Sequence, residues 1–519
     1  MATTLSRRTF VAGAALAGAA GAMTATSALA GESAASKASD IAWDDEYDVV
    51  VLGIGFSGMS AATTAADEGA KVLITEKCKD GVAGGNSRVC AQLVLYGNGD
   101  VDASRAYLKA LANSRTIPDD VLDTYAKCVA TSLDTIRDTF GMNGDDFIDV
   151  ADMGYGCMSP EYPEFEGSEK VHLYATHDGA FDSYLYQNMR SRLEDSYADK
   201  VTVWFESPAT KLIQDHDTKQ ILGVQIDKQG KTVNVKATKG VVVCCGGFEG
   251  NAEMVKDYLD LTDYIACGST FNTGDGQRMC QEVGADLWHM HSWCGLGGLG
   301  GISLIVGEGV PAQRINDFNT GAMNSGACIL VGKEGKRYVN ESETTRHGKV
   351  SNGNGQWLNP EFPEGVYIVY DKTQMDAVTA SGELPDGFQD QIVECATIAD
   401  AAKVIGCEAD ALQETIDDFN DFAKNGKDYE EGRDPETMRA FDGKAYYLLP
   451  VKPALLNTQG GPRRGADGAV IDLNGDPIPH LFSAGECGGV TAFMYPGGLN
   501  VCECFMMGQI AGASAAKQK

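Results

Sequence analysis

The segment that most constrains how this chain folds is residues 47–76, YDVVVLGIGFSGMSAATTAADEGAKVLITE. Its first residues are apolar and β-branched, as in a strand buried on both faces. Gly53, Gly55 and Gly58 then form a GxGxxG turn leading into a helix, where glycine allows a tight bend, a close pyrophosphate and helix packing. N–H groups at the helix start can bind phosphates, and Glu76 can accept ribose hydroxyls. The segment therefore predicts a bound dinucleotide.

A glycine-rich turn between a strand and a helix can also occur without any ligand, and the GxGxxG spacing alone does not separate the two cases. Here the strand, the helix and the terminal acid all stand in the expected places, with 23 positions between Gly53 and Glu76. This combination favours the dinucleotide site.

The composition limits the classes of protein to which this chain can belong. Its 519 residues are 43% hydrophobic, which is ordinary for a globular protein of two or three domains. The formal net charge of −31 argues against binding to nucleic acid or to an anionic membrane surface, because both need a basic face. The 15 cysteines form no CxxC or CxxCH motif, so we predict reduced thiols and no metal, cluster or haem site.

The N-terminal 30 residues have the pattern of a targeting signal. A twin-arginine pair, Arg7 and Arg8, precedes an Ala/Gly-rich apolar run that closes with an A-x-A-like cleavage site at residues 28–30. The run is too short and too weakly apolar for a membrane span. We therefore predict a twin-arginine signal peptide over residues 1–30, export to the cell envelope, no membrane span, and a linker over residues 31–45.

The order of the predicted elements indicates an α/β fold, α+β overall, with a Rossmann-like domain completed from distant sequence. Helices are predicted over residues 118–140, 181–196, 398–406 and 410–425, and strands over 201–205, 209–213, 240–250, 327–331 and 366–370. Glycine-rich loops from about residue 289 interrupt this pattern, which resumes near residue 446. We therefore predict a nucleotide-binding domain in two parts, 46–288 and 446–519, with an inserted substrate-capping domain at 289–445.

Several separated motifs follow one another in the order found in one superfamily. Besides the fingerprint with Glu76, they are Gly84-Gly85-Asn86-Ser87, Cys245-Gly246-Gly247-Phe248, Asn272-Thr273-Gly274-Asp275-Gly276, Lys336-Arg337-Tyr338-Val339-Asn340-Glu341, Gln459-Gly460-Gly461 and Ser483-Ala484-Gly485-Glu486. On these motifs, which span residues 47–515, the chain resembles the fumarate reductase/succinate dehydrogenase flavoprotein family. The similarity is to its soluble branch, which includes flavocytochrome c fumarate reductases, urocanate reductases and 3-ketosteroid dehydrogenases. The resemblance implies that the dinucleotide is FAD.

The resemblance assigns FAD-binding roles to residues across the whole chain. Residues 84–87 would lie against the flavin ring, where glycine allows close approach and polar side chains meet ring heteroatoms. Asp275 matches the family's acid near the ribityl and pyrophosphate groups, and Glu486 matches the acceptor of the ribityl hydroxyls. The predicted FAD-binding residues are Gly53, Gly55, Phe56, Ser57, Gly58, Glu76, Lys77, Gly84, Gly85, Asn86, Ser87, Ala209, Gly246, Asp275, Glu486, Asn500 and Val501.

The residues expected to carry the chemistry lie in the capping domain. Arg346 falls where fumarate reductases place a proton-donating arginine, so alkene reduction would take hydride from flavin N5 and a proton from Arg346. Because arginine normally stays charged, an acid must recharge it, and Glu341 and Glu343 are the candidates. Alternatively, Arg346 forms a structural ion pair with one of these acids. His347 is a further candidate, but a loop histidine is more often a hydrogen-bonding surface residue.

The chain departs from its fumarate-using relatives at two positions. It has Asn457 where they have a histidine, and Tyr495-Pro496 where they have an arginine. Those two residues clamp a substrate carboxylate, so without them a dicarboxylate site loses its geometry and fumarate is not the expected substrate. Tyr495-Pro496-Gly497-Gly498 is instead similar to the 3-ketosteroid dehydrogenases, in which a tyrosine polarises a ketone. Tyr495 would then bind a carbonyl; alternatively, it packs against the flavin.

These features predict an exported FAD-dependent reductase of a C=C bond conjugated to a carbonyl, an enoate or enone. Arg346 is its expected proton donor, and Tyr495, Glu343 and His347 are the other active-site candidates. Electrons would come from a separate donor such as a cytochrome, because the chain has one nucleotide fingerprint and no haem or cluster motif. An alternative is the reverse chemistry, desaturation of a ketosteroid-like substrate. A third is a flavin electron carrier without catalysis, which the capping domain disfavours because a carrier needs no lid over the flavin.

Overall fold

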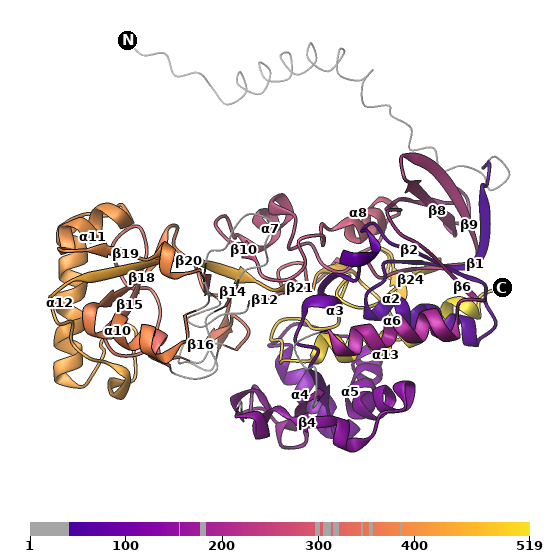
Figure 1. Ribbon diagram of the computed structural model, residues 1–519. Coiled ribbons are helices and arrows are strands. Elements are labelled where there is room, and N and C mark those ends of the chain that lie inside the picture. The colour runs from indigo at the N-terminus through magenta and orange to yellow at the C-terminus, as the bar shows by residue number, and fades with distance from the viewer. Residues whose placement is uncertain are drawn as a thin grey trace, which may run out of the picture.

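A computed structural model shows how these segments are arranged. It describes residues 41–154, 156–176, 183–295, 302–304, 313–314, 321–343, 346–351, 356–384 and 387–519. The predicted signal peptide, the first part of the linker and most of the glycine-rich loop after residue 295 lie outside the described residues. The described residues form two large sheets, each with helices on both faces, and several small ones; Figure 1 shows the second large sheet, mostly in orange, set apart from the first.

The first sheet carries the nucleotide fingerprint. Its strand order is β23-β24-β9-β1-β2-β6, with β8 joined to β9 and β7 to β8. The strands are β1 (Asp45–Leu52), β2 (Val72–Thr75), β6 (Val201–Trp204), β7 (Ala209–Gln214), β8 (Ile221–Lys228), β9 (Lys231–Val243), β23 (Ala469–Ile471) and β24 (Pro477–Ser483). From β24 to β6 all pairs are parallel. The predicted α/β fold, completed by the C-terminal strand β24, is confirmed.

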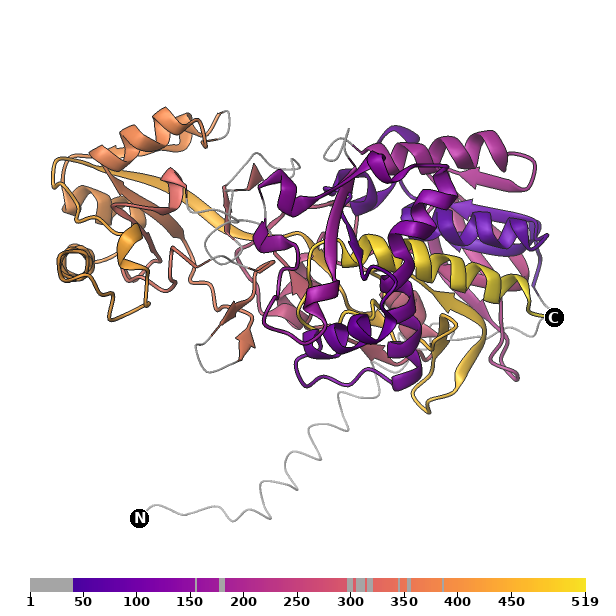
Figure 2. The same ribbon diagram turned by 90° about the horizontal axis from the view of Figure 1, so that it is seen from below.

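Alternating side chains of the central strands pack on opposite faces of this sheet. Val49 and Val51 face helices α2 (Phe56–Asp67) and α13 (Leu499–Ala516), whereas Val50 faces α8 (Asp275–Glu282). Helices α2 and α13 lie side by side (Figure 2). Glycine permits this contact, because a Cβ added at Gly512 would lie 2.2 Å from the Ala61 carbonyl oxygen.

A smaller unit between residues 94 and 196 lies against the α13 side of the sheet. It contains α4 (Val101–Leu111), α5 (Asp119–Phe140), α6 (Tyr184–Ser196) and an antiparallel sheet of β3 (Val94–Tyr96), β5 (His172–Thr176) and β4 (Phe147–Asp149). Other elements near it and near the first sheet are α3 (Gly85–Val89), α7 (Ala252–Leu259), β11 (Leu287–Trp288), β12 (Trp293–Cys294), β21 (Asn457–Thr458) and β22 (Gly461–Pro462). The loop of this unit that precedes β5 reaches the cap.

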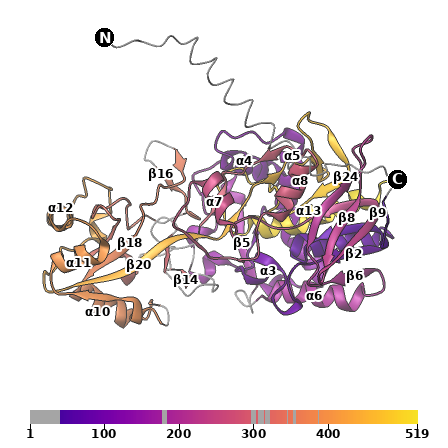
Figure 3. The same cartoon turned by 90° about the horizontal axis from the view of Figure 1, so that it is seen from above.

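The second sheet forms the cap. Its strand order is β14-β13-β20-β18-β15, with β10 and β19 also paired to β20. The strands are β10 (Ile265–Ala266), β13 (Ile302–Leu304), β14 (Gln313–Arg314), β15 (Cys328–Val331), β18 (Val366–Asp371), β19 (Val393–Cys395) and β20 (Tyr446–Leu455), and a separate ribbon pairs β16 (Val350–Ser351) with β17 (Trp357–Leu358). Helix α10 (Lys372–Ser381) covers one face, and α11 (Ile398–Ile405) and α12 (Ala409–Asn425) cover the other (Figure 3). The helices predicted at 118–140, 398–406 and 410–425 are confirmed.

Two predicted boundaries are wrong. Strand β20 is central in the cap sheet, so the chain returns to the nucleotide-binding domain after residue 455 rather than at 446. Its largely apolar sequence suits a buried strand in either sheet, so the sequence does not show which sheet it joins. At the other end, β1 begins at Asp45, and the Asp44 N–H donates to the Asn234 carbonyl at 2.9 Å. The predicted linker of 31–45 therefore ends earlier.

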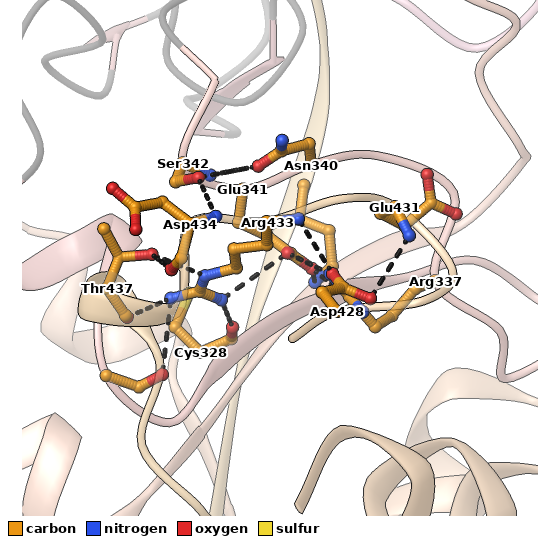
Figure 4. A network of polar contacts seen from close by, with 12 residues as sticks. Cys328, Arg337, Asn340, Glu341, Ser342, Asp428, Glu431, Arg433, Asp434 and Thr437 are labelled. Carbon is orange, nitrogen blue, oxygen red and sulfur yellow. Dashed lines mark hydrogen bonds and ion pairs between the residues drawn. The ribbon is translucent and has the colours of Figure 1, made fainter. Parts of the chain in front are cut away.

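A fully buried charge network holds the cap segment that leads to Arg346 (Figure 4). The Arg337 guanidinium donates to Glu341 at 2.7 and 3.0 Å and to Asp428 at 2.8 Å. Arg433 donates to the same Glu341 carboxylate at 3.5 Å and to the Cys328 carbonyl. Glu341 therefore has a structural role and is not the acid beside Arg346.

Among the described residues, no helix has the length and apolar character needed to cross a membrane.

Candidate active site

A cavity of about 1100 Å³, counting its open mouth, lies where β1, β2 and β9 end. Ligands of open parallel sheets bind at this edge. The cavity walls include all residues predicted to bind the cofactor except Gly58: Gly53, Gly55, Phe56, Ser57, Glu76, Lys77, Gly84, Gly85, Asn86, Ser87, Ala209, Gly246, Asp275, Glu486, Asn500 and Val501. Tyr495 and Asn457 also line it. Segments up to 448 positions apart therefore meet around one space.

The glycine turn brings backbone against backbone beneath this cavity. Gly53 has φ +101°, and a Cβ added there would lie 2.5 Å from the Cys244 carbonyl oxygen. A Cβ on Gly58 would lie 2.0 Å from the Gly53 carbonyl oxygen, so Gly58 packs helix on turn and does not face the cavity. The Phe56 N–H donates to Ser87 Oγ at 2.9 Å, which ties the turn to the loop of residues 84–87.

The acid that ends β2 is held in place by backbone. Glu76 is buried and accepts from the Ile54 N–H at 3.1 Å and the Cys78 N–H at 2.8 Å. Beside it, Lys77 Nζ pairs with Asp275 at 2.7 Å. These contacts fix a carboxylate and a cation at the edge of the cavity.

A cluster of buried acids and amides forms another part of the cavity wall. Asn86 Nδ2 donates both to Glu249 Oε1 at 2.8 Å and to Glu486 Oε2 at 3.0 Å. Asn457 and Asn500 donate to Glu486 Oε1 at 2.9 and 3.0 Å. Burial raises the pKa of Glu249 and of Glu486, and their mutual repulsion adds to the rise for Glu486. The two carboxyl groups therefore compete for one proton.

Tyr495 joins this cavity to the cap through a buried histidine. The His347 ring meets the Tyr495 ring edge to face, with centroids 5.0 Å apart. His347 Nδ1 lies 2.7 Å from both carboxylate oxygens of Glu161, and Glu161 also accepts from the Gly497 N–H at 2.7 Å. His347 is 4% exposed, so the expectation of a surface histidine is wrong. The long-range partner Glu161, 186 positions away, buries it.

Arg346 lies beside this group but does not line the cavity. Its guanidinium pairs with Glu164 at 2.5 Å and stands over the rings of Tyr162 and Trp357, 5.1 and 4.6 Å from their centroids. Glu343 accepts from the Ser351 N–H at 3.4 Å, and burial raises its pKa while Arg346 opposes the rise. The acid paired with Arg346 is therefore Glu164, not Glu341 or Glu343.

Comparison with known proteins adds to this geometry. Residues 48–501 match the family described as FAD binding domain. The chain belongs to this family. It is 28% identical to the urocanate reductase of Eggerthella lenta over 505 residues, covering 91% of this chain and 75% of that protein. It is 27% identical to the digoxin reductase of the same organism over 519 residues, covering 92% and 88%. The open conformation of a flavocytochrome c3 fumarate reductase has the same fold, with a TM-score of 0.68, 22% identity and coverage of 92% and 79%.

The cavity fits the FAD that the family binds, and the chain is an FAD-dependent oxidoreductase of the predicted flavoprotein superfamily. Two buried amide oxygens in the cavity wall, those of Asn457 and Asn500, have no hydrogen-bond partner among the described residues. Such atoms need donors. Ribityl hydroxyls and the flavin ring supply donors of this kind, and the glycine turn leaves room for the pyrophosphate.

Gly58 leaves no room for a side chain in the glycine turn. A Gly58→Ala substitution forces the Gly53 carbonyl to move, because no flexible side chain can give way. Overpacking of this kind costs about 1–3 kcal/mol. We expect a lower ratio of FAD to protein after purification and weaker rebinding of added FAD, measured by flavin fluorescence. Gly81→Ala is the control, because nothing lies within 4 Å of a Cβ there. Equal FAD affinity of the two variants would contradict this role of Gly58.

The buried carboxyl group of Glu249 should make the stability of the protein depend on pH. Burial raises the pKa of Glu249 in the folded chain. At a pH between the unfolded and the folded pKa, the folded chain therefore holds a proton on Glu249 that the unfolded chain has lost. The stability that this proton confers is present at low pH and disappears as the pH rises through the folded-state pKa. We expect the thermal midpoint of the FAD-loaded protein to fall between about pH 5 and about pH 8. Glu249→Gln should flatten this slope, and the exposed Glu253→Gln should not; identical slopes in both variants would show that the buried pair does not titrate as described.

Four residues near the site were missed by the sequence reasoning: Glu161, Glu164, Glu249 and Lys349. Glu249 comes two positions after the glycine pair at 246–247, and this motif could have identified it from the sequence. Glu161 and Glu164 lie in PEYPEFEG, which matches no motif, and their partners lie more than 180 positions away.

Proposed function

We propose that this chain is an exported FAD-dependent reductase that adds hydrogen across a C=C bond conjugated to a carbonyl group, in an enoate or enone. Its similarity to a urocanate reductase and a digoxin reductase supports the reaction class. The observation that carries the proposal is the position of Tyr495, which lines the FAD cavity and is backed by the buried pair of His347 and Glu161.

Tyr495 is suited to hold a substrate carbonyl. Burial raises its pKa well above the usual range, so the phenol stays protonated at neutral pH and can donate a hydrogen bond. A fixed donor aimed at a carbonyl oxygen stabilises the negative charge that develops there during conjugate reduction. His347 packs on the ring from the cap side, and Glu161 fixes both His347 and the Gly497 backbone. His347 and Glu161 therefore hold Tyr495 and the backbone beside it in place.

Arg346 is the proposed proton donor for the second carbon of the double bond. FAD held in the cavity would supply the hydride for the first carbon. Arg346 is already oriented by Glu164 and by two aromatic rings, and Glu164 is 41% exposed, so it can exchange protons with solvent and return one to the arginine. The structural alternative is that the pair of Arg346 and Glu164 only anchors the cap.

Export and the electron donor are proposed from the sequence. Arg7 and Arg8 support export by the twin-arginine route, and the absence of a CxxCH motif from the sequence supports a separate cytochrome-like donor. Replacing both arginines by lysine should leave the protein in the cytoplasm of an expressing cell. Unchanged export of this variant, measured by cell fractionation, would argue against the signal.

The direction of the reaction separates the proposal from its runner-up, a dehydrogenase of the 3-ketosteroid type. In one arm, chemically reduced enzyme is mixed without oxygen with enoates, enones, cinnamate-like acids and unsaturated steroids, and flavin absorption is followed. In the other arm, oxidised enzyme is mixed with saturated ketones and ketosteroids. We expect rapid reoxidation of the flavin in the first arm. Rapid flavin bleaching in the second arm alone would favour the dehydrogenase.

A further inference from the structure

The buried Lys349, two positions after His347, is the centre of a second group of side chains. Lys349 is 1% exposed, although lysine is rarely buried without a charged partner. Its ammonium donates to the Trp293 carbonyl and lies 4.7 Å from the Trp293 ring centroid and 5.2 Å from that of Phe493. Among the described residues this carbonyl is the one hydrogen-bond acceptor of the ammonium, which can donate three hydrogen bonds.

Arg115 contributes a second positive charge beside the same aromatic ring. Its guanidinium stacks 3.7 Å from the Phe493 ring centroid, and its Nε donates to His291 Nε2 at 2.6 Å. His291 therefore accepts this hydrogen bond as a neutral ring. Burial, followed by Arg115 and Lys349, lowers the pKa of His291, which keeps it neutral.

The positive charge of this group is not balanced. In the part of the chain that the structure describes, neither Lys349 nor Arg115 forms an ion pair. The pKa of Lys349 is lowered to about 7, mainly by burial and also by Arg115, while Cys294 and Glu161 act in the opposite direction. Cys294 is itself kept protonated by burial, and Glu161 is engaged by His347. A buried ammonium next to a guanidinium is costly unless an anion joins them.

The group lies next to the reaction site described above. Cys294 is paired in register with Asn457, which lines the FAD cavity. Lys349 follows His347 by two positions, and His347 contacts Tyr495. Cys294 also acts electrostatically on both Lys349 and Tyr495, so the group is close to the proposed reaction site.

We propose that Lys349 and Arg115 bind the carboxylate of the substrate, so that this enzyme acts on enoates, the anionic class, in preference to neutral enones. This rests on the proposed function, because it names the substrate class of the same site. It also accounts for the missing dicarboxylate clamp at Asn457 and Tyr495: a single carboxylate is recognised instead, from the cap segment and from the loop after α4.

The test uses the FAD-loaded, oxidised protein and a matched pair of probes, cinnamate and its neutral methyl ester. Binding is read from the change in flavin absorption, so no turnover is needed. We expect the wild type to bind cinnamate at least about tenfold more tightly than the ester, since contacts to charged groups contribute this much. Lys349→Met should weaken cinnamate binding about 10- to 100-fold and leave ester binding unchanged. The control is Lys333→Met, which removes an exposed lysine of the cap.

Two further arms keep the outcome decisive. Arg115→Gln, at a half-buried position, should also lower the preference for cinnamate, and it replaces Lys349→Met if that variant does not fold. In the wild type, cinnamate affinity should fall as the pH rises above about 7, because the free enzyme must first protonate Lys349, and ester affinity should not change. An ester bound as tightly as cinnamate, no cinnamate binding, or an unchanged preference in both variants overturns the inference. If the anion site is overturned but the enzyme still reduces neutral enones rapidly, the proposed function is unaffected. If the enzyme prefers cinnamate to its ester but reduces no alkene, the anion site is supported and the proposed function is wrong.

Discussion

Replacing Arg346 by alanine should lower the rate at which an enoate or enone reoxidises the reduced enzyme by about 10²- to 10⁴-fold. This is the range expected when a positioned proton donor is removed and hydride transfer must wait for a proton from water. Arg346 is one residue from His347, which contacts Tyr495 at the cavity wall, and under the proposed function its guanidinium donates the proton to the second carbon. Single-turnover reoxidation without oxygen measures the effect.

The variants around Arg346 separate catalysis from anchoring. Arg278→Ala removes an exposed arginine of the nucleotide-binding domain and should leave the rate unchanged. Glu164→Gln should slow proton return to Arg346 and change the pH dependence of the rate, which a merely structural ion pair would not do. If Arg346→Ala or Arg346→Lys reduces the alkene at the wild-type rate, Arg346 is not the proton donor.

The second large effect is expected on stability, at the buried charge network of the cap. Glu341 accepts from Arg337 and Arg433, and all three side chains are fully buried. Glu341→Gln leaves the buried Arg433 guanidinium without an ion-pair partner among the described residues, and Arg337 keeps only Asp428 and the more distant Glu430. Breaking a buried ion pair from one side costs about 3–5 kcal/mol. Unfolding of the cap in urea, followed by tryptophan fluorescence, should therefore begin at a much lower concentration.

The matched control for this substitution lies in the same domain. Glu414 pairs with Lys336 on the surface, where the pair is screened by solvent, so Glu414→Gln should have no measurable effect on unfolding. Equal midpoints for Glu341→Gln and Glu414→Gln would mean that the network does not hold the cap together.

The residues that line the cavity around the glycine turn could be predicted because their signals are local. The GxGxxG turn, the helix after it and Glu76 lie within 30 positions. The turn requires glycine because backbone packs against backbone there, as the structure shows at Gly53 and Gly58. The family motifs added the distant acids, such as Glu486. All of these except Gly58 line one cavity.

The cap side could be predicted only in part, because its contacts join distant segments without a motif. Nothing in the sequence around Glu161 shows that it will bury His347 or support Gly497. Lys349 comes shortly after Arg346 and His347 but belongs to no motif itself. Its burial depends on Trp293 and Phe493 from two other segments. Strand β20 has no feature that selects one sheet over the other. Long-range packing decides each of these cases.

The measurement that tests the central claim most directly is a single turnover of the FAD-loaded protein without oxygen. The flavin is reduced photochemically, mixed with a panel of enoates and enones, and followed by absorption while the products are identified by mass spectrometry. The account predicts that at least one enoate reoxidises the flavin much faster than buffer does and that one equivalent of the saturated product forms per flavin. Reoxidation by oxygen or one-electron acceptors alone, with every alkene recovered unchanged, would contradict it.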